Sequence, residues 1–439
     1  MASRDPCTCH TCLEDGGAGG AQMMPPRIVY ALASLSSLAC ITLLQRHAIL
    51  RWCHAGTPKH VRTLSSRAAA SLESALRKAF ALPPPRARRL QQKADAAVAG
   101  LPFCEAELHF SAGTHRTSSG ERPPPTRLRI HDARGEEARF RLHEHSFELV
   151  RAPPYDRSLD LYDAAAVVAR LYPQIEQLLL SQLPGATRVL IFDHLLRKRS
   201  REAAELAEAR RRAGAGADES TLQPKTRFLG RPVEVVHGDY TARSGYSRAR
   251  QLLQPYCSEE EIDGALRERF VFVNVWHHFG ARPAQTDPLA LCVWGSFTPR
   301  DVRTRRLIFP HRTGETYQAS FSKQQRWVYF SELSREEALL IKVFDSRDDG
   351  ETSRFSVHSA FRLPEQLGAD AASLVERESV ELRAVVLYGK GLESIAPNFQ
   401  NASMAGPDAP PKVQEQARLT EQELYMKSES HVLDPSEEW

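Results

Sequence analysis

The sequence predicts an α+β protein whose mainly β core folds as a jelly-roll or cupin-like double sheet with flanking helices. After residue 232, seven segments are rich in β-branched and aromatic residues, and most alternate apolar with polar positions. Their connections are irregular, and only two helical segments, 246–253 and 259–267, interrupt them. Many strands joined in this way are typical of a double sheet. The strand candidates are 233–240, 270–276, 290–297, 327–330, 338–344, 354–361 and 379–388.

Composition places the chain among soluble globular proteins. Of 439 residues, 42% are hydrophobic and 26% charged, which is enough apolar material for a large core. The net charge is +4, from 58 basic and 54 acidic residues, so the charge balance predicts no nucleic-acid partner. Cys104, Cys257 and Cys292 are scattered through the body of the chain, which fits a reducing compartment.

Residues 1–100 are expected to be a leader, mostly disordered, that ends in a basic linker. Within it, 28–44 is an uncharged, mostly apolar run, short for a membrane span of roughly 17–25 residues. Flanking arginines suit a membrane anchor on a cytoplasmic catalytic domain. The stretch 23–95 is poor in acids and rich in Arg, Ala and Ser, which suits mitochondrial targeting instead. A surface helix or an incorrect gene start is the third interpretation.

A single catalytic domain is expected over 101–398. It begins with strands near 108–110 and 127–130, continues through a helix at 161–183, and includes a buried strand at 189–194. The stretch 198–222 is highly charged and contains a Gly/Ala spacer, so we expect a mobile excursion there. Residues 399–439 are polar and predicted to be mostly disordered.

The stretch 235–241 carries a candidate metal site. In a strand, residues two apart point to the same face, so His237 and Asp239 would project side by side. Two imidazoles and one carboxylate form a face that suits non-haem Fe(II) and leaves coordination positions open. His358, in the predicted strand 354–361, is the candidate for the second imidazole. The competing interpretations are an exposed strand end for the first pair and a hydrogen-bonded core histidine for His358.

A second cluster lies on the last predicted strand. Arg377, Ser379, Glu381 and Arg383 share one strand face. A buried guanidinium beside a hydroxyl suits bidentate binding of a carboxylate, such as the far end of a 2-oxo acid cosubstrate. A solvated, salt-bridged strand face is the alternative.

The order of ten motifs over roughly 105–390 resembles the fungal and bacterial hydroxylase/desaturase family of secondary metabolism. That family includes the aspergillic-acid-type hydroxylases, the gibberellin desaturase and the cephem 7α-methoxylase component. The motifs are DARGEE (132–137), VLIFDHLLRKR (189–199), VVHGDYT (235–241), RFVFVNVW (269–276), DPLALC (287–292), GETY (314–317), RWVYF (326–330), EEALLIKVFDS (336–346), RFSVHSAF (354–361) and RESVELRAVVLY (377–388).

The resemblance implies a double-stranded β-helix that binds Fe(II) and 2-oxoglutarate and uses O₂. It supports His237, Asp239 and His358 as the metal triad. Arg377 with Ser379 resembles the pair that such oxygenases use for the cosubstrate, and Arg383 is the second choice. The implied function is hydroxylation or desaturation of a small secondary metabolite. The sequence indicates neither the substrate nor the oligomeric state.

Two positions depart from the family pattern. His277-His278 stands where the family usually has Arg-Pro, and Val293 stands where it usually has Asp. Both are expected near the pocket. They favour a second hypothesis, a catalytically silent jelly-roll binding protein. A metal-dependent hydrolase is a third, weakened by the lack of a separate general base.

Overall fold

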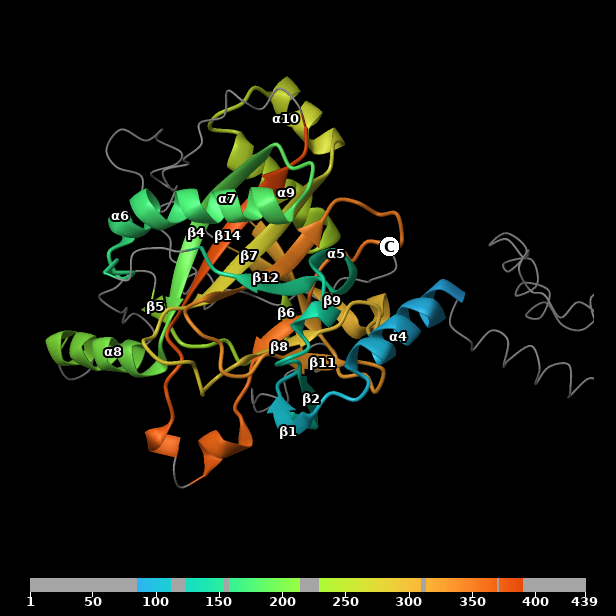
Figure 1. The fold of residues 1–439 in the computed structure, drawn as a ribbon. Coiled ribbons are helices and arrows are strands. Elements are labelled where there is room, and N and C mark those ends of the chain that lie inside the picture. The colour runs from blue at the N-terminus through green and yellow to red at the C-terminus, as the bar shows by residue number, and fades with distance from the viewer. Residues whose placement is uncertain are drawn as a thin grey trace, which may run out of the picture. The chain divides into compact units, whose positions relative to one another are not determined.

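The computed structural model describes residues 85–111, 124–153, 158–213, 229–308, 313–368 and 371–389. They form two β-sheets with helices on the outside (Figure 1). The eight-stranded sheet runs β1 (Phe103–Leu108), β2 (Thr126–Asp132), β11 (Trp327–Tyr329), β8 (Leu289–Cys292), β13 (His358–Ala360), β6 (His237–Gly238), β10 (Thr313–Ala319), β9 (Val302–Ile308). The six-stranded sheet runs β3 (Phe147–Arg151), β12 (Glu337–Asp345), β7 (Phe270–His278), β14 (Ser379–Leu387), β4 (Arg188–Arg197), β5 (Leu229–Gly230). The predicted mainly β double sheet is confirmed.

The six-stranded sheet is buried on both faces. On β7, Phe272 and Trp276 belong to the core shared with the eight-stranded sheet, whereas Val273 and Val275 belong to the core under the helices. Those helices are η3 (Val167–Leu171) and α7 (Tyr172–Gln182), which crosses the sheet in Figure 1. Since side chains alternate along a strand, Asn274 faces the inside of the sandwich.

Strand β14 follows the same alternation. Its residues Val380 and Leu382 pack in the core under the helices. Glu381 and Arg383 therefore face the inside, beside Trp276 and Asn274, their register partners on β7. The predicted sharing of one face by these charged residues is reproduced in the structure.

A β-bulge interrupts β4 next to this charged face. The register of β14 with β4 moves from Arg383 opposite Asp193 to Ala384 opposite Ile191, so Phe192 is the extra residue. A bulge re-aims side chains and is common beside functional sites. Here it places Asp193 opposite Arg383 on the inner side.

Helix α9 (Ala242–Leu253) begins directly after the predicted metal motif. Its N-cap is Thr241, whose side chain accepts a hydrogen bond from the Ser244 amide in a capping box. The Thr241 hydroxyl also donates to the Glu315 carboxylate at 3.1 Å. These bonds fix the backbone that follows Asp239.

Two segments are more ordered than the sequence indicated. Residues 85–98, assigned to the leader, form α4 (Pro85–Val98), and its Ala94 and Val98 are buried in the core. Residues 199–213, assigned to the mobile excursion, form α8 (Arg199–Ala213), and Arg199 pairs with the buried carboxylate of Asp287 at 2.9 Å. Buried apolar contacts and an ion pair outweigh the polar composition that suggested disorder.

Three predictions lie outside the described residues. They are the apolar run 28–44, the second part of the excursion, 214–222, and the tail 399–439. Among the ranges that the structure describes, no helix is long and apolar enough to span a membrane. Anchoring through 28–44 therefore stays a prediction.

Candidate metal centre

Two histidines meet across neighbouring strands. His358 of β13 is the direct register partner of His237 of β6 in the antiparallel pair. Side chains of directly opposed residues project to the same face, and the two imidazole centroids lie 4.6 Å apart. Asp239 follows β6 by one residue and completes the group. One ligand atom from each of the three residues lies within 4.8 Å of the other two.

Both imidazoles are oriented for coordination through Nε2. Nδ1 of His237 lies 2.7 Å from the Val235 carbonyl oxygen, and Nδ1 of His358 lies 3.4 Å from the Ser356 carbonyl oxygen. A carbonyl accepts a hydrogen bond, so Nδ1 carries the proton in each ring and Nε2 keeps its lone pair. The two Nε2 atoms lie 3.4 and 3.9 Å from Oδ1 of Asp239. Ligand atoms about 2.1 Å from one shared metal are roughly 3 Å apart, so this donor set fits a metal with little movement.

The second oxygen of Asp239 is held from the opposite sheet. Asn274 Nδ2 of β7 donates to Asp239 Oδ2 at 2.7 Å. The carboxylate therefore turns Oδ1 toward the histidines and Oδ2 toward Asn274. Asn274 is 2% exposed. The sequence does carry a signal for this residue, because Asn274 is the one polar residue in the run 270–276.

The charges of the triad depend on one another. Burial alone would raise the pKa of Asp239, but the imidazoles of His237 and His358 lower it well below its usual range. Burial alone would lower the pKa of His237, and the Asp239 carboxylate raises it on balance. Burial, together with the nearby His237 ring, lowers the pKa of His358. The lowered pKa keeps the Asp239 carboxylate ionised, which is the form that binds a divalent cation.

Arg377 is buried inside the sandwich, next to Trp276 on the inner face of β7. It is 2% exposed, and its Nε donates to Ser379 Oγ at 2.9 Å while Nη1 donates to the Asp287 carbonyl oxygen at 2.9 Å. Its guanidinium carbon is 4.9 Å from the centre of the Trp276 ring. Burial lowers the pKa of Arg377 to about 9, which leaves the group charged at neutral pH. These two bonds use two of its five N–H donors.

Arg383 is neutralised by the protein. Its guanidinium lies 3.0 Å from Glu381 and 3.3 Å from Asp193. Burial alone would raise the pKa of Glu381, and Arg383 lowers it on balance. The salt-bridged alternative for this strand face therefore applies to Arg383 and Glu381. Asp193 was not predicted from the sequence, since the β-bulge decides which residue of β4 faces Arg383.

The two departures from the family pattern do not touch the triad. His277 lies on the opposite face of β7 from Asn274, and its Nδ1 donates to the Glu337 carbonyl oxygen at 2.9 Å. Val293, fully buried, packs in the apolar core between the sheets. His277 therefore does not face the triad, whereas its neighbour His278 is the register partner of Ser379. Neither His277 nor Val293 replaces a metal ligand.

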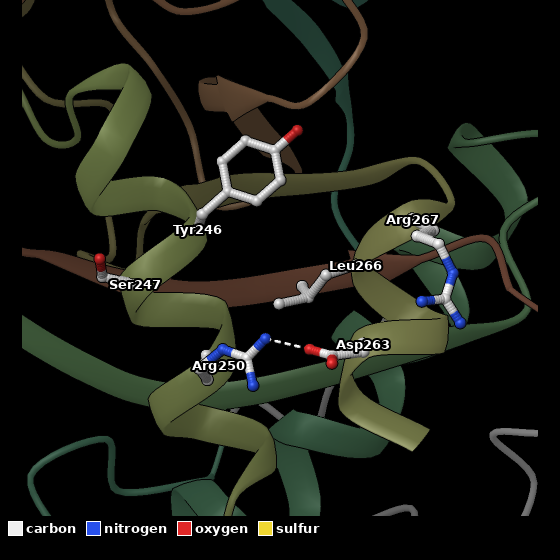
Figure 2. A pocket seen from close by; sticks show the side chains of 6 residues that line it. All are labelled: Tyr246, Ser247, Arg250, Asp263, Leu266 and Arg267. Carbon is white, nitrogen blue, oxygen red and sulfur yellow. Dashed lines mark hydrogen bonds and ion pairs between the residues drawn. The ribbon is translucent and has the colours of Figure 1, made fainter. Parts of the chain in front are cut away.

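A separate hollow of about 430 Å³ lies between α9 and α10 (Glu259–Arg267), as Figure 2 shows. Arg250 of α9 pairs there with Asp263 of α10. None of its lining residues belongs to the metal centre, so the hollow is no part of that site. The lining residues are Tyr246, Ser247, Arg250, Asp263, Leu266 and Arg267.

Comparisons with known proteins agree with this geometry. The family model described as "Oxidoreductase/YMDC permease-like domain" matches residues 102–387, which is 286 of the 439 residues. The hydroxylase/desaturase efuI of Hormonema carpetanum is 25% identical over 64% of this chain and 88% of its own length. The Fe(II)/2-oxoglutarate-dependent dioxygenase nvfI of Aspergillus novofumigatus is 26% identical over 67% of this chain and 100% of its own.

A solved structure of the iron and alpha-ketoglutarate-dependent endoperoxidase NvfI superimposes with a TM-score of 0.51 at 25% identity, over 67% of this chain and 100% of that one. The fold and the comparisons define an oxidoreductase related to iron- and 2-oxoglutarate-dependent oxygenases. The chain belongs to the family whose model matches residues 102–387. The predicted resemblance to hydroxylase/desaturases is confirmed.

Proposed function

We propose that His237, Asp239 and His358 bind the Fe(II) of a 2-oxoglutarate-dependent oxygenase that hydroxylates or desaturates a small molecule. The observation that carries the proposal is the convergence of one ligand atom from each of the three residues within 4.8 Å, with both histidine Nε2 atoms 3.4 and 3.9 Å from Asp239 Oδ1. Two imidazoles and one carboxylate on one face are the ligand set of non-haem Fe(II) oxygenases. When bound, Fe(II) with 2-oxoglutarate supplies the oxidation chemistry, in which O₂ oxidises an unactivated C–H and 2-oxoglutarate becomes succinate and CO₂.

We further propose that Arg377 with Ser379, and not Arg383, binds the far carboxylate of 2-oxoglutarate. Arg383 is the register partner of Asn274, so it lies level with the metal centre. Its charge is also already neutralised by Glu381 and Asp193.

The Arg377 guanidinium contacts the ring of Trp276, which lies two residues after Asn274 on β7. Two residues of a strand span about 6.7 Å, so this guanidinium lies roughly that far along the strand from the level of the metal centre. A five-carbon chain is about 5 Å long, so it would reach from the metal to the guanidinium. An unpaired buried charge is costly, and a bound carboxylate would compensate Arg377.

Other residues orient the metal ligands and shield the site from water. Asn274 holds Asp239 so that one carboxylate oxygen faces the metal position. Core side chains from both sheets, among them Phe272 and Leu291, surround the site with apolar surface. A dry, preorganised pocket strengthens the electrostatic contacts within it and limits side reactions.

The test is succinate release from 2-oxoglutarate under O₂ by the full chain loaded with Fe(II). We expect release that requires iron, is stopped by chelation, and is lost in His358→Ala. Succinate formation that continues at the same rate after chelation, or in His358→Ala, would refute the assignment. A small-molecule library scored for substrate-stimulated succinate release would then identify the substrate.

A further inference from the structure

One buried polar group inside the sandwich takes no part in the proposed binding of metal or cosubstrate. Trp276 is 2% exposed, and its indole Nε1 has no hydrogen-bond acceptor among the described residues. Buried indole N–H groups usually find a partner, because an unsatisfied donor away from water is unfavourable. The exception calls for an explanation.

The surroundings of Trp276 point to an anionic ligand. Its register partners are Leu339 of β12 and Glu381 of β14, so the ring lies on the inner face of β7. It is two residues from Asn274, which holds the metal ligand Asp239, and the Arg377 guanidinium lies 4.9 Å from its centre. An unused N–H donor and a buried cation thus lie at the same end of the site.

A second buried tryptophan lacks an acceptor in different surroundings. Trp327 is 1% exposed and its Nε1 also has no acceptor among the residues that the structure describes. It packs, however, in the core on the outer face of the eight-stranded sheet. Among the described residues, no arginine makes a cation–π contact with Trp327.

We propose that Trp276 is a cosubstrate-binding residue whose indole N–H donates a hydrogen bond to the carboxylate held by Arg377. That carboxylate is then bound by the guanidinium, the Ser379 hydroxyl and the indole N–H. The ring face of Trp276 also attracts the Arg377 guanidinium and so helps to hold it in position. The inference rests on the proposed function and assigns the site a third anchor for a five-carbon dicarboxylate.

Trp276→Phe tests this directly, because phenylalanine keeps a ring under Arg377 and removes only the N–H donor and part of the ring. Trp327→Phe is the matched control, and Arg377→Ala reports on the cosubstrate site itself. The affinity for 2-oxoglutarate is measured by calorimetry on protein loaded with Zn(II), which needs no turnover. We expect Trp276→Phe to weaken binding at least about 10-fold and Trp327→Phe to leave it unchanged.

A second measurement uses the folded wild-type protein. With ¹⁵N-labelled tryptophan the chain has five indole signals, and Trp276 is identified by its loss in Trp276→Phe. Adding 2-oxoglutarate to the Zn(II)-loaded protein should move that signal in the wild type and not in Arg377→Ala.

The outcomes distinguish a failure of the cosubstrate assignment from a failure of the role given to Trp276. If the wild type binds no 2-oxoglutarate, or Arg377→Ala binds it unchanged, the cosubstrate assignment fails and this inference fails with it. If Arg377→Ala weakens binding while Trp276→Phe does not, and the Trp276 signal stays in place, only the role of Trp276 is overturned.

Discussion

His358 lies directly opposite His237 across the β13–β6 pair, with ring centroids 4.6 Å apart, although 120 residues separate them in the chain (358 − 237 − 1). The two histidines of the candidate metal centre are therefore brought together by strand pairing. Asn274, on the other sheet, connects the two halves of the sandwich through Asp239.

Asn274→Ala should weaken metal binding by about 10- to 100-fold, since loss of a residue that orients a metal ligand typically costs that much. Its Nδ2 is the donor to Asp239 Oδ2 at 2.7 Å. Dissociation constants for Co(II) and its visible spectrum would report both affinity and coordination. Val275→Ala, on the opposite face of β7, is the control and should alter stability only. An unchanged affinity and spectrum in Asn274→Ala would show that the hydrogen bond does not orient the ligand.

Arg377→Ala and Arg383→Ala should fail in different ways. Removing Arg377 should raise the apparent 2-oxoglutarate constant in the succinate assay roughly 10- to 150-fold, the equivalent of about 1.5–3 kcal/mol. Removing Arg383 leaves Glu381 and Asp193 without their shared cation. It should lower the melting temperature, because breaking a buried ion pair costs about 3–5 kcal/mol. The opposite pattern would make Arg383 the cosubstrate residue.

The protein should lose stability in mild acid through buried neutral histidines. Burial lowers the pKa of His277 to about 4, below its ordinary value of 6.5. Between pH 6.5 and 4 the unfolded chain binds the proton and the folded chain does not, so the free energy of unfolding falls as the pH drops. For His277 the loss at pH 5 is about 2 kcal/mol.

His277→Gln, which keeps a donor for the Glu337 carbonyl, should reduce this acid sensitivity. The comparison is urea unfolding of both proteins at pH 5 and pH 7.5. Burial also lowers the pKa of His194 to about 4. Since His194 is present in both proteins, its contribution to the pH dependence cancels when they are compared. Equal pH dependence of the two proteins would mean that His277 is protonated in the folded state.

Helix α4 should be needed for full stability. Ala94 and Val98 are buried, and Asp95 pairs with Arg326 at 2.7 Å. A chain beginning at residue 83 should unfold like the complete chain. A chain beginning at residue 99 should lose about 2–4 kcal/mol, because it uncovers apolar core. Urea midpoints that agree between the two shortened chains would show that the domain begins near 99.

The sequence indicated the long strands of the six-stranded sheet well, and the eight-stranded sheet less well. Residues 270–276, 338–344 and 379–388 are strands because their apolar residues fill both faces of a buried sheet. β9 and β10, rich in charged and polar residues, were missed. β9 lies at a sheet edge, where one side is free of pairing, so an apolar pattern is not required.

The candidate site was partly predictable. The spacing of two residues between His237 and Asp239 predicted correctly that they lie together. The predicted strand 233–240 is, however, reduced to β6, which covers only His237–Gly238. Val233 and Val235 instead pair singly with Ala360 and His109. The partners from other strands, Asn274 and Asp193, depend on register and on the bulge in β4, which local pattern does not encode.

The triad is tested most directly by the iron content of the purified chain after anaerobic loading with Fe(II) and removal of free metal. We predict one iron per chain in the wild type and in the control His277→Gln, and almost none in His237→Ala, Asp239→Ala and His358→Ala, with circular dichroism unchanged. Full iron content in any one of those three variants would remove that residue from the metal site and contradict the triad.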